Sequence, residues 1–307
     1  MILRLLALSI SLSLLTVACG GDVEELDASP LGTSEAPLSI TVEDQVVARL
    51  PSSTGAVYGY GEYLPPGYLT STSSYPVVIH LNGLGEFGTS STQAALLDVV
   101  TRHGALNRIR YTSAGKAYFG QHQVMVFTPQ AASNWVPAEV NAFVNFLIAN
   151  YRVDTTRIYL TGLSYGGYGS WKYAYEYGDR LAALAPMATN IGAPGPTITE
   201  LLNVPVWGVH SFSDGSSLSA EQSWLLGVTK NYGQNQMVSV PSLSASLTYL
   251  FSASTDAWTS QSGVVATGSS IARLTVYPGS AHNCWTQTYN NNAFWDWMLA
   301  QQRSTTP

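Results

Sequence analysis

A serine at position 164 lies in the pattern G-x-S-x-G, formed by Gly162-Leu163-Ser164-Tyr165-Gly166. In this pattern the serine occupies a sharp turn between a strand and a helix, which we call the elbow. The two glycines let the strand and the helix approach without clashing β-carbons. The start of the helix presents backbone N–H groups where an oxyanion would form. An apolar strand, Ile158-Tyr159-Leu160, runs into the pattern and a helical segment follows. The sequence therefore predicts that Ser164 is a nucleophile.

The base that would activate this serine is predicted from chain order and position. In chains with this elbow the order is Ser, then Asp or Glu, then His. Two histidines follow Ser164: His210 ends an apolar strand, and His282 lies in a loop of small residues after the last strand. A histidine inside a core strand is usually structural, whereas a loop can hold an imidazole over the strand ends. We therefore predict His282 as the base.

Two aspartates are candidates for the acid that orients this base. Asp214 follows the predicted strand 204–210 by four residues, in a loop of Ser and Gly. This is where the acid that comes between the serine and the histidine in chain order is expected. Asp256 lies in the long segment between that strand and His282. We favour Asp214 and keep Asp256 as the alternative.

The second half of an oxyanion hole is predicted in the turn Asn82-Gly83-Leu84-Gly85-Glu86, directly after the apolar run 76–81. Its glycines leave the backbone free to turn amides toward the serine. We predict that the backbone N–H groups of Leu84 and Tyr165 hold the oxyanion. An ordinary glycine turn is the alternative interpretation.

Strands and helices alternate from about residue 40, which predicts parallel βαβ units in a doubly wound, mostly parallel sheet. Residues 232–270, rich in Ser, Thr, Gly and Gln, break the alternation and predict an insertion before the last strand, with strands of its own or as a roof over the site. The predicted strands are 45–50, 57–63, 76–81, 123–127, 157–160, 181–186, 204–210 and 272–277, and the predicted helices are 91–103, 137–151, 165–177, 218–230 and 291–302.

The composition is typical of one domain that acts on neutral compounds. The chain has 307 residues, of which 46% are hydrophobic, enough for a single core that we place at residues 40–303. Only 10% of residues are charged and the net charge is −6. This argues against nucleic acid as a partner and against a basic amphipathic membrane helix. The predicted chemistry implies no metal and no organic cofactor.

The N-terminus is typical of an export signal. A short positive start precedes an apolar run, 5–17, that is too short to remain in a bilayer as a spanning helix. Leu15-Thr16-Val17-Ala18-Cys19 resembles a bacterial lipobox, which would leave Cys19 for lipidation, although Thr16 stands where such signals usually have Leu. Cleavage without lipidation is the alternative. We predict an exported protein, lipid-anchored or freely secreted, with a signal peptide at 1–19 and a flexible tether at 20–39.

The chain has two cysteines, and Cys19 belongs to the predicted signal, so no disulfide framework is expected. Cys284 lies two residues after His282. Its thiol is an alternative nucleophile, but we favour a small buried hydrophobic residue.

Further blocks of sequence surround these residues. They are 63–68, 76–88, 128–130 with Trp135, 151–154, 157–167, 281–286 and 295–299. Together they resemble the phospholipase/carboxylesterase-like α/β-hydrolases, a group that includes feruloyl-esterase-like and polyhydroxybutyrate-depolymerase-like secreted enzymes. The resemblance covers residues 57–231 and 271–302. It implies an α/β-hydrolase fold and a serine carboxylic ester hydrolase with a Ser-His-Asp triad.

Two positions depart from that group. The group usually has His-Gly where this chain has Asn82-Gly83, so we expect altered hydrogen bonding in the loop rather than lost activity. The strand that ends at His210 would commonly continue with Gly, whereas here it continues Ser211-Phe212-Ser213-Asp214. The carboxylate is kept, while the loop that carries it differs in sequence from that of the group.

The resemblance implies a small-molecule or polymeric ester as substrate, and it does not distinguish feruloyl, acetyl and polyester types. Trp135, which follows the strand 123–127, and Trp285, close to His282, are expected near the substrate. Two other functions stay open. Prolyl-oligopeptidase-like peptidases share the elbow, and a non-catalytic protein could use the cleft and its aromatic residues to bind a polymer.

Overall fold

The computed structural model describes residues 38–215 and 218–304 of the chain. The predicted signal peptide with Cys19, and nearly all of the predicted tether, lie outside these residues. Within the described ranges, no helix is both long and apolar enough to cross a membrane.

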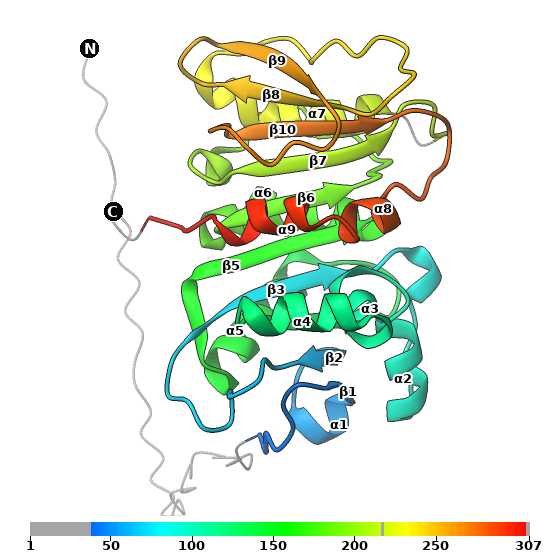
Figure 1. The fold of residues 1–307 in the computed structure, drawn as a ribbon, viewed down its shortest axis with the longest axis vertical. Helices are drawn as coiled ribbons and strands as arrows, with labels where there is room; N and C mark the ends of the chain where they lie inside the picture. Colours follow the sequence, from blue (N-terminus) through cyan, green and yellow to red (C-terminus); the bar gives the residue numbers. More distant parts are fainter. Residues whose placement is uncertain (1–37, 216–217, 305–307) are drawn as a thin grey trace, which may run out of the picture. The chain divides into compact units, whose positions relative to one another are not determined.

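Ten strands of the described chain form one sheet (Figure 1). They are β1 (Val46–Arg49), β2 (Gly59–Tyr63), β3 (Tyr75–Leu81), β4 (Met125–Gln130), β5 (Val153–Leu163), β6 (Ala183–Met187), β7 (Val206–Ser211), β8 (Leu247–Ser252), β9 (Ala257–Ser262) and β10 (Ala272–Tyr277). Their order is β1-β2-β4-β3-β5-β6-β7-β10-β8-β9. The central strands from β4 to β10 are parallel, and the outer strands β2, β1, β8 and β9 add antiparallel pairs. The predicted mostly parallel sheet is confirmed.

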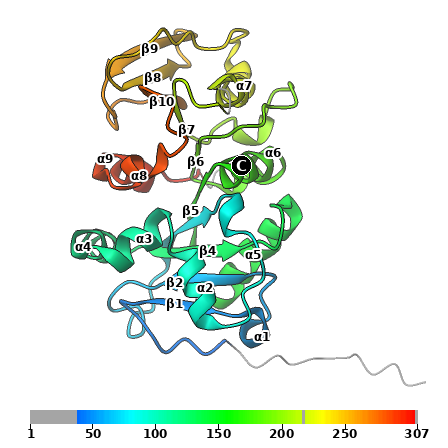
Figure 2. The same ribbon diagram turned by 90° about the vertical axis from the view of Figure 1, so that its right-hand side faces the viewer.

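Helices cover both faces of this sheet (Figure 2). They are α1 (Pro51–Thr54), α2 (Gln93–Val100), α3 (Gly104–Tyr111), α4 (Ser113–Gln121), α5 (Pro137–Asn150), α6 (Tyr165–Tyr177), α7 (Leu218–Thr229), α8 (Trp285–Tyr289) and α9 (Asn292–Leu299), with short 3-10 turns η1 (Leu84–Glu86), η2 (Gly178–Arg180), η3 (Thr199–Leu201) and η4 (Lys230–Tyr232). Buried side chains of α5, α6 and α7 share one core cluster. Those of α3, α4, α8 and α9 share a second.

The central strands supply both clusters because successive side chains of a strand point to opposite faces. In β3, Val77, Ile79 and Leu81 belong to the first cluster and Val78 to the second. All seven residues of β3 are buried. A strand covered on both faces has no polar alternation, which is why its sequence is a nearly continuous apolar run.

Four short helices, α1, α3, α4 and α8, were not predicted from the sequence. The predicted helix 91–103 is shorter in the structure, and α3 and α4 follow it. The signal for α4 was its cap: the Thr112 side chain accepts a hydrogen bond from Gly115 N–H at 2.9 Å. Helices of eight or nine residues carry only two turns of apolar pattern, so their period is weak in the sequence.

The insertion before the last parallel strand is confirmed, and it does carry its own strands. β8 pairs antiparallel with β10, and β9 pairs with β8. The hairpin therefore continues the sheet beyond β10. The alternative, that the insertion roofs Ser164, is wrong for these two strands.

Candidate active site

Ser164 occupies the turn between β5 and α6 with φ 53° and ψ −117°. A positive φ is strained for a residue with a β-carbon, and such strain is typical of functional sites. The flanking glycines are required by close packing. A β-carbon on Gly162 would lie 2.3 Å from Gly166 O, and one on Gly166 would lie 2.0 Å from Leu81 O. The turn is further fixed by Ser164 N–H, which donates to Met187 O at 2.8 Å.

The structure brings Ser164, His282 and Asp214 together in one line of hydrogen bonds. His282 Nε2 lies 2.9 Å from Ser164 Oγ, and His282 Nδ1 lies 2.7 Å from Asp214 Oδ2. The Asp214 side chain is 5% exposed and that of His282 is 41% exposed. A buried carboxylate thus holds a solvent-accessible imidazole against the serine hydroxyl. This is the geometry of a nucleophile, a base and an orienting acid.

Asp214 and His282 meet because β7 and β10 are parallel neighbours, so their carboxyl ends lie at one edge of the sheet. The loops beyond these ends are joined by backbone bonds. Phe212 N–H donates to Tyr277 O at 2.8 Å, and Ser213 N–H donates to Gly279 O at 2.9 Å. The Ser211 hydroxyl donates to Ala281 O at 2.6 Å. These bonds set the distance between the acid and the base.

The alternative acid, Asp256, lies elsewhere. It occupies the exposed turn between β8 and β9 with φ 48°, and its carboxylate lies near Gly233. His210, predicted as a core residue, is fully buried and places Nε2 3.6 Å from Asp214 Oδ2. Its contact with the acid was not foreseen from the sequence.

The alternative nucleophile, the Cys284 thiol, is fully buried. Its Sγ donates to Val209 O at 3.7 Å, and burial raises the pKa of this thiol. A raised pKa disfavours the thiolate that nucleophilic attack would need. The interpretation of Cys284 as a small buried residue agrees with this environment.

Leu84 and Tyr165, the predicted oxyanion donors, are the first residues of η1 and α6. The first N–H groups of a helix have no acceptor within it. The loop that carries Leu84 also runs beside the nucleophile, because a β-carbon on Gly83 would lie 3.5 Å from Ser164 Cβ. Both N–H groups are therefore close to Ser164 in the fold and unused by their own helices, as an oxyanion hole requires.

Buried side chains hold this loop in place. Trp135 Nε1–H donates to Asn82 O at 2.9 Å, and Gln130 Nε2–H donates to Glu86 O at 3.1 Å. Glu86 is buried, which raises the pKa of its carboxyl, and its Oε1 lies 3.7 Å from His103 Nε2. Within the described chain, the buried Asn82 side chain has no hydrogen-bond partner at either polar atom. At Asn82, where the α/β-hydrolases that the sequence resembles usually have His, the loop is therefore held by its backbone carbonyl and not by the side chain.

The two predicted substrate residues differ in their surroundings. Trp135 is 1% exposed and packs against Gly169 of α6, so it offers almost no surface to a ligand and instead supports the loop. Trp285 is 8% exposed and meets the His282 ring edge-on, at 5.2 Å between centroids and 89° between planes. Such an edge contact fixes the imidazole plane. Of the two, only Trp285 touches one of the three hydrogen-bonded residues, His282.

Comparison with known proteins agrees with this geometry. Residues 52–276 match the esterase family, described as "Putative esterase". The chain belongs to this family. No protein with curated annotation matches the sequence. The predicted relationship to an esterase group is confirmed.

Solved structures similar to this esterase share its fold. One is a thermostable esterase, with 21% identity and a TM-score of 0.60 over 84% of this chain and 63% of that one. Another is an acetyl xylan esterase from Aspergillus awamori, with 12% identity and a TM-score of 0.52 over 83% of this chain and 98% of that one. The esterase thus spans less than two thirds of the thermostable enzyme. The predicted α/β-hydrolase fold is confirmed.

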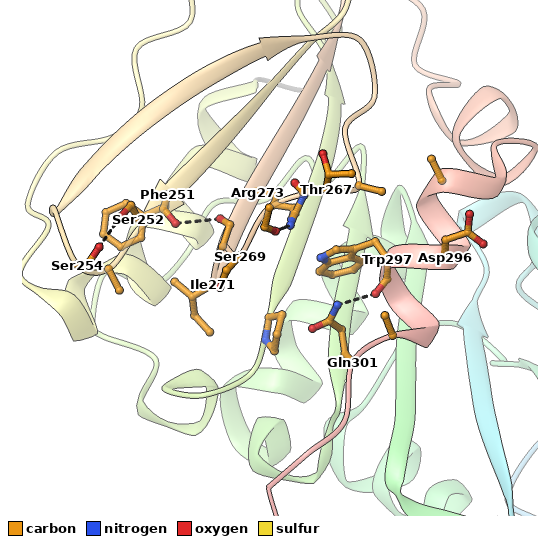
Figure 3. A pocket seen from close by; sticks show the side chains of 17 residues that line it. Phe251, Ser252, Ser254, Thr267, Ser269, Ile271, Arg273, Asp296, Trp297 and Gln301 are labelled. Atoms are coloured by element: carbon orange, nitrogen blue, oxygen red, sulfur yellow. Dashed lines mark hydrogen bonds between the residues drawn. The ribbon is translucent and has the colours of Figure 1, made fainter.

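One cavity of the esterase is remote from Ser164. It measures about 870 Å³ and is lined at the starts of β7 and β10 by Pro205, Ile271 and Arg273 (Figure 3). Asp214 and His282 follow the opposite ends of these six-residue strands, about 20 Å away. The Arg273 guanidinium donates to the carbonyls of Val265, Thr267 and Gly268, the last two of which line the cavity. Arg273 therefore fixes a loop and lies away from the hydrogen-bonded residues at Ser164. Nowhere in the described ranges do three or more His, Cys, Asp or Glu side chains gather as metal ligands.

Glu221 of α7 is fully buried behind the elbow. Its Oε1 accepts Trp171 Nε1–H at 3.1 Å and its Oε2 accepts Thr189 N–H at 3.3 Å. Trp171 belongs to α6 and Thr189 follows β6, so this carboxyl links the helix of the nucleophile to the neighbouring strand. Burial raises the pKa of Glu221 to about 8.

Glu221→Gln is expected to remove a pH dependence of the folding free energy. Because the folded-state pKa is raised, the stability from protonation is fully present below the unfolded pKa of 4.5 and is lost as pH rises to about 8. The free energy of unfolding of the esterase should therefore fall relative to the variant by an amount on the order of a few kcal/mol from pH 5 to pH 9. Urea unfolding at both pH values measures this.

Glu176→Gln is the control, because it makes the same chemical change at an exposed position of α6. Equal pH dependence of the free energy of unfolding in the parent and in Glu221→Gln would contradict the prediction.

Proposed function

We propose that this esterase cleaves carboxylic esters through a Ser-His-Asp acyl-enzyme mechanism. The observation that carries the proposal is the continuous line of hydrogen bonds from Ser164 Oγ through His282 to Asp214, with distances of 2.9 and 2.7 Å. Each contact lies within the range expected between a nucleophile, its base and the orienting acid.

In the first step His282 Nε2 accepts the proton of Ser164, whose oxygen attacks the ester carbonyl. Leu84 and Tyr165 N–H groups donate to the oxyanion of the tetrahedral intermediate. His282 then gives this proton to the leaving alcohol, and the C–O bond to that alcohol breaks. In the second step water replaces the serine by the same sequence and releases the acid. Asp214 keeps the proton of His282 on Nδ1, which leaves Nε2 free to act as the base.

The substrate and the location belong to the same proposal. The ester is of the feruloyl, acetyl or polyester type, and the enzyme acts outside the cytoplasm, either anchored by a lipid on Cys19 or freely secreted. The apolar run 5–17 and the lipobox-like residues 15–19 support export. A panel of p-nitrophenyl esters of graded chain length, with methyl ferulate and a short polyester, will rank these substrates.

A fluorophosphonate probe tests the mechanism. We expect covalent labelling of the folded esterase on the peptide that contains Ser164, and none after heat denaturation, because only the assembled triad activates the hydroxyl. Mass spectrometry of the digested protein locates the label. The labelled protein should lose hydrolysis of p-nitrophenyl acetate in proportion to labelling.

Failure to label the folded protein would overturn the proposal and favour a non-catalytic polymer-binding protein. Comparison of an aryl ester with a blocked dipeptide amide separates the remaining alternative. Faster cleavage of the amide would indicate a peptidase of the prolyl-oligopeptidase type.

A further inference from the structure

Helix α6 presents a row of half-exposed side chains that begins next to the nucleophile. Tyr165, Tyr168, Lys172 and Tyr175 follow one another at spacings of three, four and three residues. Residues at these spacings lie on one face of a helix. All four are partly accessible to solvent, whereas Trp171 and Tyr173 point into the core. This face of α6 is therefore an accessible surface with three tyrosines.

Aromatic contacts continue this row in both directions. Toward the oxyanion loop, Phe87 meets Tyr165 edge-on at 5.7 Å between ring centroids. Along α6, Tyr165 meets Tyr168 at 6.2 Å. Trp224 of α7 then meets Tyr168 at 6.4 Å and Tyr175 at 6.5 Å. A connected set of aromatic rings, of which Trp224 is buried, thus runs from the oxyanion loop to the groove between α6 and α7, two helices on the same face of the sheet (Figure 2).

A cleft of about 190 Å³ opens at the far end of this surface. The half-exposed rings of Tyr168 and Tyr175 form its aromatic walls, with the buried Trp224 behind them, and Pro194 of the segment after β6 closes one side. Pockets for whole drug-sized ligands measure about 300 to 1,000 Å³. The cleft is smaller than that range, so its volume suits one ring of a larger ligand.

Two charged side chains, Lys172 and Glu176, also line the cleft. Lys172 Nζ lies 5.7 Å from the centre of the Tyr168 ring, and neither side chain forms an ion pair within the described residues. A purely apolar ring would desolvate both charges without compensation, which is costly. A ring with many hydroxyl groups would offer its C–H face to the tyrosines and its hydroxyls to the ammonium and the carboxylate.

We propose that the α6 cleft, defined by Tyr168, Lys172, Tyr175, Glu176 and Trp224, binds a sugar ring of an oligosaccharide that carries the scissile ester. This proposal rests on the proposed function of Ser164. At 1.5 Å per residue, Tyr168 lies about 4.5 Å and Tyr175 about 15 Å along the helix axis from Tyr165. The ring in the cleft is thus not the one that carries the ester but one farther along the same chain.

Steady-state kinetics of Tyr175→Ala test this role. We expect KM for an acetylated xylo-oligosaccharide to rise about tenfold, because one wall of the cleft is lost far from the reacting atoms, while kcat stays unchanged. Hydrolysis of p-nitrophenyl acetate, which is too short to reach Tyr175, should match the parent. Lys172→Met, a surface change that leaves both tyrosine walls in place, should raise the same KM by a smaller factor.

Tyr177→Ala is the matched control, since Tyr177 lies on α6 and is also half-buried, but stacks on Tyr173 outside the cleft. An equal KM in Tyr175→Ala and Tyr177→Ala, with both proteins folded, would overturn the proposal.

Binding without catalysis separates this proposal from the proposed function. Calorimetry with Ser164→Ala and the ester-free oligosaccharides xylotetraose and cellotetraose should detect binding, and the further change Tyr175→Ala should abolish it. If the probe labels Ser164 but no oligosaccharide binds, the mechanism stands and the sugar subsite is wrong. If oligosaccharide binds through Tyr175 but Ser164 is not labelled, the cleft stands and the proposed mechanism fails.

Discussion

Ser164→Ala is expected to lower kcat for p-nitrophenyl butyrate by about 10⁴- to 10⁶-fold. The variant removes the oxygen that forms the acyl-enzyme, but leaves His282, Asp214 and the predicted oxyanion donors in place. Those remaining groups can still position the ester and polarise its carbonyl for attack by water, so a small residual rate is expected. Release of p-nitrophenolate under saturating substrate measures the change.

The fold should survive this substitution. Ser164 makes its structural contact through backbone N–H to Met187 O, which alanine keeps, and alanine bears the same positive φ at similar cost. Ser254→Ala, in the exposed turn between β8 and β9, is the matched control and should retain the parent rate. Parent-level hydrolysis by a folded, pure Ser164→Ala would exclude Ser164 as the nucleophile.

Local pattern and chain order were enough to predict which residues meet at the site. Ser164 is predictable because its strained turn needs glycines at fixed offsets, and these are visible in five residues. Asp214 and His282 are predictable because parallel strands end at one edge of the sheet, and both residues follow such strands. Chain order did not exclude Asp256. Only the pairing of β8 with β10, a contact between distant segments, carries Asp256 away into the hairpin turn.

The buried side chains that hold the site in place could not be predicted from residue spacing in the sequence, because each makes its contact with a segment far away in the chain. Trp135 was expected near the substrate, yet its indole reaches Asn82 O, 53 residues away, and is buried there. Glu221 looked like an ordinary polar position of a helix and is instead buried between α6 and the end of β6. Burial of this kind depends on which helix faces pack against the sheet, and the local sequence pattern does not determine this.

Asp214→Asn is expected to lower kcat by about 10⁴-fold while leaving the fold intact. The reason is the position of one proton on His282. Asp214 Oδ2 accepts from Nδ1–H at 2.7 Å, so the neutral imidazole carries its proton on Nδ1 and offers an unprotonated Nε2 to Ser164. An asparagine amide at this place can donate to Nδ1, which moves the imidazole proton to Nε2. The ring then faces Ser164 Oγ with a donor and cannot accept its proton.

Asp256→Asn is the matched control for this substitution, since it makes the same chemical change in the exposed hairpin turn. Asn tolerates the positive φ of 48° found there, so this variant should keep both stability and the parent kcat. The pair of variants therefore separates loss of a triad carboxylate from loss of any carboxylate. A large loss in Asp256→Asn with normal activity in Asp214→Asn would reverse the assignment of the acid. If both variants keep the parent kcat, Ser164 and His282 act without a carboxylate. The buried contact between Asp214 and His282 argues against that result.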